Sequence, residues 1–159
     1  MGLKSNLLVL VMVFGALGSA PLMAEAQFNI IGSLLKLINI QGTVFCTADG
    51  NIGTNATSTP VFPNALVQLQ CGNGNIVSTT TTNNGGIFSM FLNPVQFVLS
   101  SLLSNCNLVV KTPISDCNAT LPSTGFLTSS LQFLGSFVQD GLMQIMKVAP
   151  NPFTFIPSP

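Results

Sequence analysis

Residues 63–71, Pro-Asn-Ala-Leu-Val-Gln-Leu-Gln-Cys, form the stretch that decides the fold. The first three residues predict a turn, and after them Val67, Leu69 and Cys71 alternate with two glutamines. Successive side chains of a strand point to opposite faces of a sheet, so this alternation predicts a half-buried antiparallel strand. Gly-Asn-Gly at 72–74 predicts a hairpin turn directly after it. We therefore expect a small, mainly β domain built around this strand.

Other segments have the same β character. The strongest is Ile40–Cys46, and residues 153–155 would form an edge strand at the end of the chain. Asn83–Gly86 predicts a hairpin turn that leads into the strand after it. The further strands predicted from these patterns are 40–46, 76–82, 87–92, 106–112, 131–133 and 153–155.

One or two short amphipathic helices are also expected. Asn93 and Pro94 predict a helix start, with Asn as the cap and Pro at the first helical position. The apolar stripe of this helix has helical spacing: Val95, Val98, Leu99, Leu102 and Leu103. A second stripe, weakened by two glycines, predicts a helix between 134 and 146. Residues 28–38 fit either a helix or a strand.

The first residues predict export. Leu7–Leu17 is an apolar run too short to span a bilayer but of the length found in signal peptides. Small residues at Ala24 and Ala26 predict cleavage before Gln27. We expect residues 1–26 to be a signal peptide and residues 27–159 a single secreted, extracellular domain with no transmembrane segment.

Charged residues are scarce. After the predicted leader the chain has three lysines and three aspartates, with no arginine and no histidine: Lys36, Lys111, Lys147, Asp49, Asp116 and Asp140. Without clustered cations, nucleic-acid binding is not expected. Self-association or adhesion to waxy surfaces is consistent with so little charge. Asn55 and Asn118 each begin a glycosylation sequon.

The four cysteines are Cys46, Cys71, Cys106 and Cys117, and four cysteines can form two disulfides in three ways. A zinc site is the competing interpretation. The export signal predicts an oxidising compartment, and the chain has no CxxC pair and no histidine. We therefore expect two disulfides and no metal.

No catalytic site or cofactor is predicted. Without histidine the usual serine and cysteine dyads cannot form, and the aspartates fit solvated turns. The glycines at 72–74 lack the lysine and following helix of a phosphate loop. The segment 95–103 has no cationic residue on its polar face, so we expect it to cover the sheet and not to bind a membrane.

Several motifs, in this order, resemble the olive-pollen-allergen and extensin-like family of secreted plant proteins. They are Ile40–Cys46, Asn64–Cys71, Thr82–Phe88 and the pair Cys106 and Cys117 around Val109–Pro113. Residues 34–40 and 58–64 are similar to a subgroup that trichomes secrete onto leaf surfaces.

The resemblance implies a Greek-key-like β-barrel or sandwich and a pairing of Cys46 with Cys117. The family partners of Cys71 and Cys106 are missing here, so we expect these two to pair with each other. The subgroup implies a defence role, in which the protein inhibits germination of microbial spores, with a microbial surface or cell-wall component as partner. A structural or adhesive protein of the cell wall or cuticle is the alternative, and a carrier of apolar ligands a weaker one.

Overall fold

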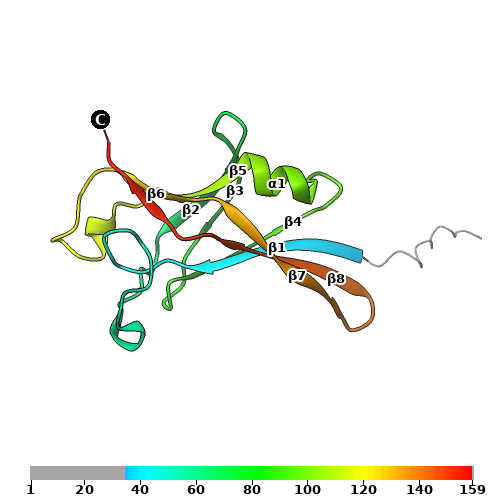
Figure 1. Ribbon diagram of the computed structural model, residues 1–159, viewed down its shortest axis with the longest axis horizontal. Coiled ribbons are helices and arrows are strands. Elements are labelled where there is room, and N and C mark those ends of the chain that lie inside the picture. The colour runs from blue at the N-terminus through cyan, green and yellow to red at the C-terminus, as the bar shows by residue number, and fades with distance from the viewer. Residues whose placement is uncertain (1–34, 159) are drawn as a thin grey trace, which may run out of the picture. The chain divides into compact units, whose positions relative to one another are not determined.

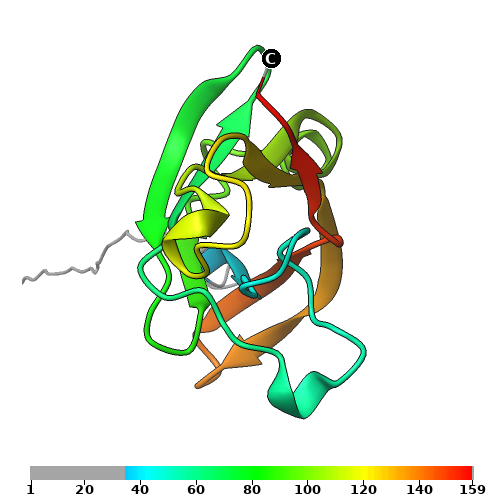
Figure 2. The same ribbon diagram turned by 90° about the vertical axis from the view of Figure 1, so that its left-hand side faces the viewer.

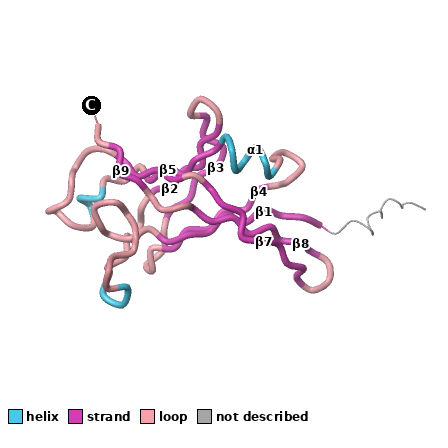
Figure 3. The backbone as a smooth tube through the Cα atoms, in the orientation of Figure 1, coloured by secondary structure: helices cyan, strands magenta, loops and turns pink. Residues whose placement is uncertain are grey.

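The computed structural model describes residues 35–158, and most of its elements are strands (Figures 1 and 3). The predicted signal peptide lies outside these residues. The strands are β1 Leu35–Thr43, β2 Leu66–Cys71, β3 Asn75–Thr81, β4 Ile87–Leu92, β5 Cys106–Val110, β6 Phe126–Ser129, β7 Leu131–Gln139, β8 Met143–Pro150 and β9 Thr154–Ile156. The helical elements are α1 Leu99–Asn105 and the 3-10 helices η3 Ala56–Ser58 and η4 Ile114–Asp116.

The chain divides into two compact units. The described part of the smaller unit comprises residues 35–36 and 138–144. In it, the Leu35 amide donates to the Leu142 carbonyl oxygen at 3.2 Å, and Asp140 and Gly141 both have positive φ angles. The larger unit comprises residues 37–137 and the described residues from 145 onward. The hydrophobic core and every groove discussed below lie in the larger unit.

The strands form two sheets, with the orders β4-β1-β8-β7 and β3-β2-β5-β6-β9. Each sheet has two edge strands, so the sheets are not closed into the barrel that was one of the two expected forms. β3 and β4 follow each other in the chain but belong to different sheets. The turn at 83–86 therefore carries the chain from one sheet to the other, and the prediction of a hairpin there was wrong.

Core residues of both sheets join in one hydrophobic cluster, which is sandwich-like packing. From the four-stranded sheet, Ile38, Ile40 and Phe88 are almost fully buried. From the other sheet, Val67 and Leu69 are fully buried, on the face that the alternation of residues 66–71 predicted. β2 has the predicted bounds, and it pairs with both β3 and β5. The central strand and the hairpin turn at 72–74 are thus confirmed.

The helix predicted between 134 and 146 is wrong, because this segment forms parts of the neighbouring strands β7 and β8. Asp140 and Gly141 adopt the left-handed backbone of a tight turn, with φ angles of 55° and 69°. Asp-Gly is a strong hairpin signal, and it outweighs an apolar helical stripe interrupted by glycine.

The helix expected after Asn93 does form, but it begins at Leu99, with Val98 as its cap. Asn93 instead closes a turn, since its side-chain oxygen accepts from the Val95 amide at 2.9 Å. Of the predicted apolar stripe only Leu102 is fully buried, while Val95 is 89% exposed.

Other strand limits differ from those predicted: β3 lies one residue earlier than 76–82, β5 ends at Val110 and not at 112, β7 continues to Gln139 and not only to 133, and β9 lies one residue later than 153–155. The strand predicted at 40–46 is β1, which begins at Leu35 and ends at Thr43, so the ambiguous segment 28–38 is a strand where it is described. β6 was not predicted at all. Figure 2 shows the long loop between β1 and β2, which carries η3 and leaves both sheets before it returns to β2.

Candidate binding surface

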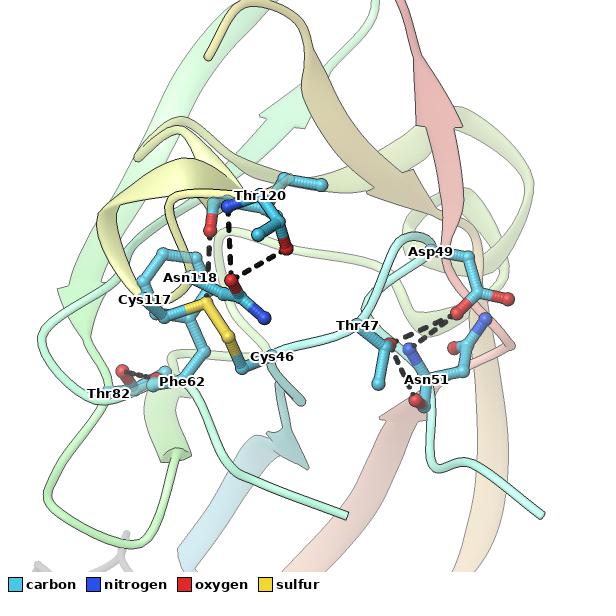
Figure 4. The surroundings of a disulfide bond; sticks show 10 residues. Cys46, Thr47, Asp49, Asn51, Phe62, Thr82, Cys117, Asn118 and Thr120 are labelled. Carbon is cyan, nitrogen blue, oxygen red and sulfur yellow. Dashed lines mark hydrogen bonds between the residues drawn. A yellow bond between two sulfur atoms is a disulfide. The ribbon is translucent and has the colours of Figure 1, made fainter. Parts of the chain in front are cut away.

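The Cys46–Cys117 disulfide ties the loop after β1 to the segment that follows η4 (Figure 4). Its Cα atoms lie 6.0 Å apart, and 71 positions separate the two cysteines in sequence. The loop carrying Cys46 is also held by the backbone, because the Cys46 amide donates to the Pro60 carbonyl oxygen at 2.9 Å. Two loops far apart in sequence are thereby fixed side by side.

The second disulfide joins Cys71 and Cys106, which stand directly opposite each other in the β2–β5 register. The structure thus has the Cys46–Cys117 pair that the family resemblance implied and the Cys71–Cys106 pair expected from the missing family partners, and the residues it describes contain no free cysteine. Neither bridge leaves a thiolate available as a nucleophile.

Both sequons lie on exposed loops of the larger unit. The Thr57 hydroxyl donates to the side-chain oxygen of Asn55 at 3.0 Å. The Thr120 hydroxyl donates to the same atom of Asn118 at 2.8 Å (Figure 4). In both cases the Asn side-chain nitrogen has no hydrogen bond within the described chain.

Asp49, Asp116 and Asp140 each lie at a turn or at the end of a helix. Asp49 closes a turn, since one of its carboxylate oxygens accepts from the Asn51 amide at 3.1 Å and from the Thr47 hydroxyl at 3.2 Å (Figure 4). The Asn51 amide is the main reason that the pKa of Asp49 lies below its ordinary value. Asp116 ends η4 beside a disulfide, and Asp140 belongs to the smaller unit.

Two negative findings apply to residues 35–158. They contain no group of three or more His, Cys, Asp or Glu side chains that could hold a metal ion. No helix among them has both the length and the apolar character needed to cross a membrane.

A groove in the larger unit has a volume of about 470 Å³. Its residues come from β1, the start of β7, the end of β8 and the loops beside them, and none of them is charged. The Asn51 side chain holds one wall in place. Its amide nitrogen donates to the Phe153 carbonyl oxygen at 2.8 Å, and its oxygen accepts from the Phe153 amide at 2.7 Å.

A second groove, of about 220 Å³, shares Gln41, Gly42 and Thr43 with the first. Lys147 lines it, together with the exposed apolar side chains of Ile87 and Leu134. The sequence predicted neither groove. Their residues are scattered along the chain and form no motif, so no local signal could have indicated them.

Comparison with known proteins identifies the family. Residues 34–159 match the family described as Phylloplanin antifungal protein, and this range includes every described residue. The chain is also 41% identical over 155 residues to Phylloplanin of Nicotiana tabacum, an alignment that covers 97% of this chain and 96% of that protein. The chain belongs to the phylloplanin family.

The similarity predicted from residues 34–40 and 58–64 was to phylloplanin, and this part of the resemblance is confirmed. The family match covers both sheets, both disulfides and both grooves of this chain, so the phylloplanin assignment applies to the whole described fold. No solved structure matches the chain.

Proposed function

We propose that this protein is secreted to the plant surface and inhibits the germination or growth of microbial pathogens by binding, without catalysis. The observation that carries the proposal is the match of residues 34–159 to an antifungal family. The 41% identity to Phylloplanin over nearly the full length of both chains supports it.

Secretion is supported by the signal peptide predicted at residues 1–26 and by the cysteines. All four are paired, and such bridges persist in oxidising compartments. The related proposal, that phylloplanins belong with the wider olive-pollen-allergen and extensin-like family, is supported by the Cys46–Cys117 pair that this resemblance implied.

A non-enzymatic mechanism is supported by the side chains that the protein has. The chain has no histidine, its cysteines are oxidised, and Asp49 is engaged in its own turn. Nucleophilic and acid–base catalysis both need a positioned group of this kind. A component of the microbial surface would then be the partner.

We also propose that Asn55 and Asn118 carry N-glycans. Both lie on exposed loops, and each amide nitrogen is directed away from the hydrogen bond that its oxygen accepts. Treatment of the secreted protein with peptide N-glycosidase should lower its mass. Asn55→Gln and Asn118→Gln should each remove the part of this mass shift that comes from the glycan at the replaced residue. An unchanged mass in protein secreted by plant cells would contradict this proposal.

The proposed function is tested by germination of fungal spores in the secreted protein, beside a sample that has been reduced and alkylated. We expect inhibition by the secreted protein and none by the reduced and alkylated sample. The reason is that the disulfides hold in place the loops of the proposed binding surface. An active alkylated sample would show that the folded surface is not needed.

An adhesive role in the cuticle or cell wall is the second candidate. It is favoured by the zero net charge and by exposed apolar side chains such as Phe91 and Leu134, which are 58% and 61% exposed. Normal germination at surface concentrations, with the protein found in the wall and absent from leaf washes, would support this role and refute the antifungal one.

A further inference from the structure

The outer face of the four-stranded sheet carries a cation with only neutral partners. In β1, Ile38 and Ile40 point into the core, so Asn39 and Gln41 lie on the opposite face. Lys147 of β8 lies on this face too. Its ammonium group donates to the side-chain oxygen of Asn39 and, at 3.4 Å, to that of Gln41.

Hydrogen bonds across the sheet hold this cation in place. Asn39 is only 3% exposed, and its amide nitrogen donates to the Ser89 hydroxyl at 2.9 Å and to the Met90 carbonyl oxygen at 3.3 Å. These bonds turn the Asn39 oxygen toward Lys147. An ammonium group has three N–H donors, and its two contacts use two of them.

No ion pair is formed between Lys147 and any described carboxylate of the larger unit. Asp49 is engaged in its own turn, and Asp116 ends η4. The ammonium group is therefore a fixed positive charge that an anion from outside the chain could neutralise.

The two grooves that meet at Gln41, Gly42 and Thr43 differ in charge. The groove at Lys147 has a volume of about 220 Å³ and an apolar rim formed by Ile87 and Leu134. The groove that shares Gln41, Gly42 and Thr43 with it has a volume of about 470 Å³, contains no charged residue and is lined by Phe45 and Ile52 among other apolar side chains. That volume lies within the range of small-molecule sites.

We propose that the two grooves together bind a long-chain carboxylate, that is, a fatty acid or hydroxy fatty acid in monomeric form. Its carboxylate contacts the Lys147 ammonium group, and its alkyl chain lies in the uncharged groove. A single anionic head beside a long apolar tail matches one cation beside an uncharged apolar groove. This inference does not depend on the antifungal activity.

The test is displacement of a fluorescent long-chain carboxylate from the secreted protein by palmitate, with hexadecanol and octanoate as competitors. We expect saturable binding of one palmitate per chain. Hexadecanol has the same tail without the charge, and octanoate has the charge with a shorter tail, so each should bind at least about tenfold more weakly.

Two variants and one matched control locate the site. Lys147→Met should weaken palmitate binding at least about tenfold, and Lys147→Arg should largely restore it. Ile52→Asp, an exposed position in the uncharged groove, should also weaken it. Lys111→Met removes the same charge outside both grooves, where Lys111 lies over the Phe126 ring, and should bind palmitate as the wild type does.

Several results would overturn the proposal. They are wild-type protein without saturable palmitate binding, equal binding of hexadecanol and palmitate, and unchanged binding by Lys147→Met. Binding to phosphatidylglycerol vesicles without binding of monomeric palmitate would identify an anionic bilayer as the ligand and also refute it. If Lys147→Met does not fold, the comparison of palmitate with hexadecanol on the wild type decides.

Discussion

Replacing Cys46 and Cys117 together by alanine should lower the free energy of unfolding by about 4 kcal/mol at 25 °C. The reason lies in how the two disulfides are nested. The outer bridge joins cysteines 71 positions apart, and the Cys71–Cys106 bridge, which spans 35 positions, lies inside that loop. While the Cys71–Cys106 bridge is intact, it shortens the loop that Cys46–Cys117 closes to about half of the 71 positions between these two cysteines. Closing a loop of that length costs the unfolded chain about 4 kcal/mol of entropy.

The Cys71–Cys106 bridge should contribute less to the free energy of unfolding than the Cys46–Cys117 bridge. With Cys46–Cys117 intact, the unfolded chain already keeps residues 71 and 106 within one closed loop, so their separate closure costs about 3 kcal/mol. The paired strands β2 and β5 also hold these two cysteines opposite each other in the native state. The Cys46→Ala/Cys117→Ala variant should therefore be the less stable of the two double variants.

Equilibrium urea unfolding without reductant measures both effects. For a slope of about 2 kcal/mol/M, the outer-bridge variant should unfold about 2 M earlier than the wild type, and the inner-bridge variant about 1.5 M earlier. A loss below about 1 kcal/mol in either variant would refute the loop-closure reasoning. So would a clearly larger loss for the inner bridge.

Three further changes test local features by the same measurement. Gly86→Ala should cost more than about 2 kcal/mol, because φ is 74° and a Cβ would lie 2.7 Å from the Val44 carbonyl oxygen, whereas Gly72→Ala, with φ 65° and open space, should cost about 1 kcal/mol. Equal losses would contradict this. Thr82→Val should cost about 1–3 kcal/mol, because the buried hydroxyl donates to one backbone carbonyl at 2.6 Å and accepts from one backbone amide at 2.9 Å. Thr82→Ser keeps these bonds and should lose much less; similar losses would argue against the bonds. Asp49 has a pKa below its ordinary 3.8, so its carboxylate stabilises the fold above that pH and ceases to do so as the pH falls through the lowered value. Wild type should therefore exceed Asp49→Asn in stability at about pH 6 but not at about pH 2, and a constant difference would be evidence against this role.

The strands β2 and β4 could be predicted to the residue because their signals are local. In β2, buried and half-buried positions alternate at period two between turn residues, and this pattern needs no knowledge of the partner strands. In β4, every second residue from Phe88 onward is buried. The segment from 134 to 146 failed because its apolar residues fit a helical spacing, while the Asp140–Gly141 turn decided its conformation.

The sequence by itself determined the β class, the central hairpin and the absence of histidine chemistry, since each follows from the type and local spacing of residues. Only the tertiary structure decided that β3 and β4 belong to different sheets, because pairing depends on the partners available in space. The same holds for the proposed ligand site. Lys147 and Asn39 are 108 positions apart, and only the pairing of β1 with β8 brings the ammonium group to its neutral partner.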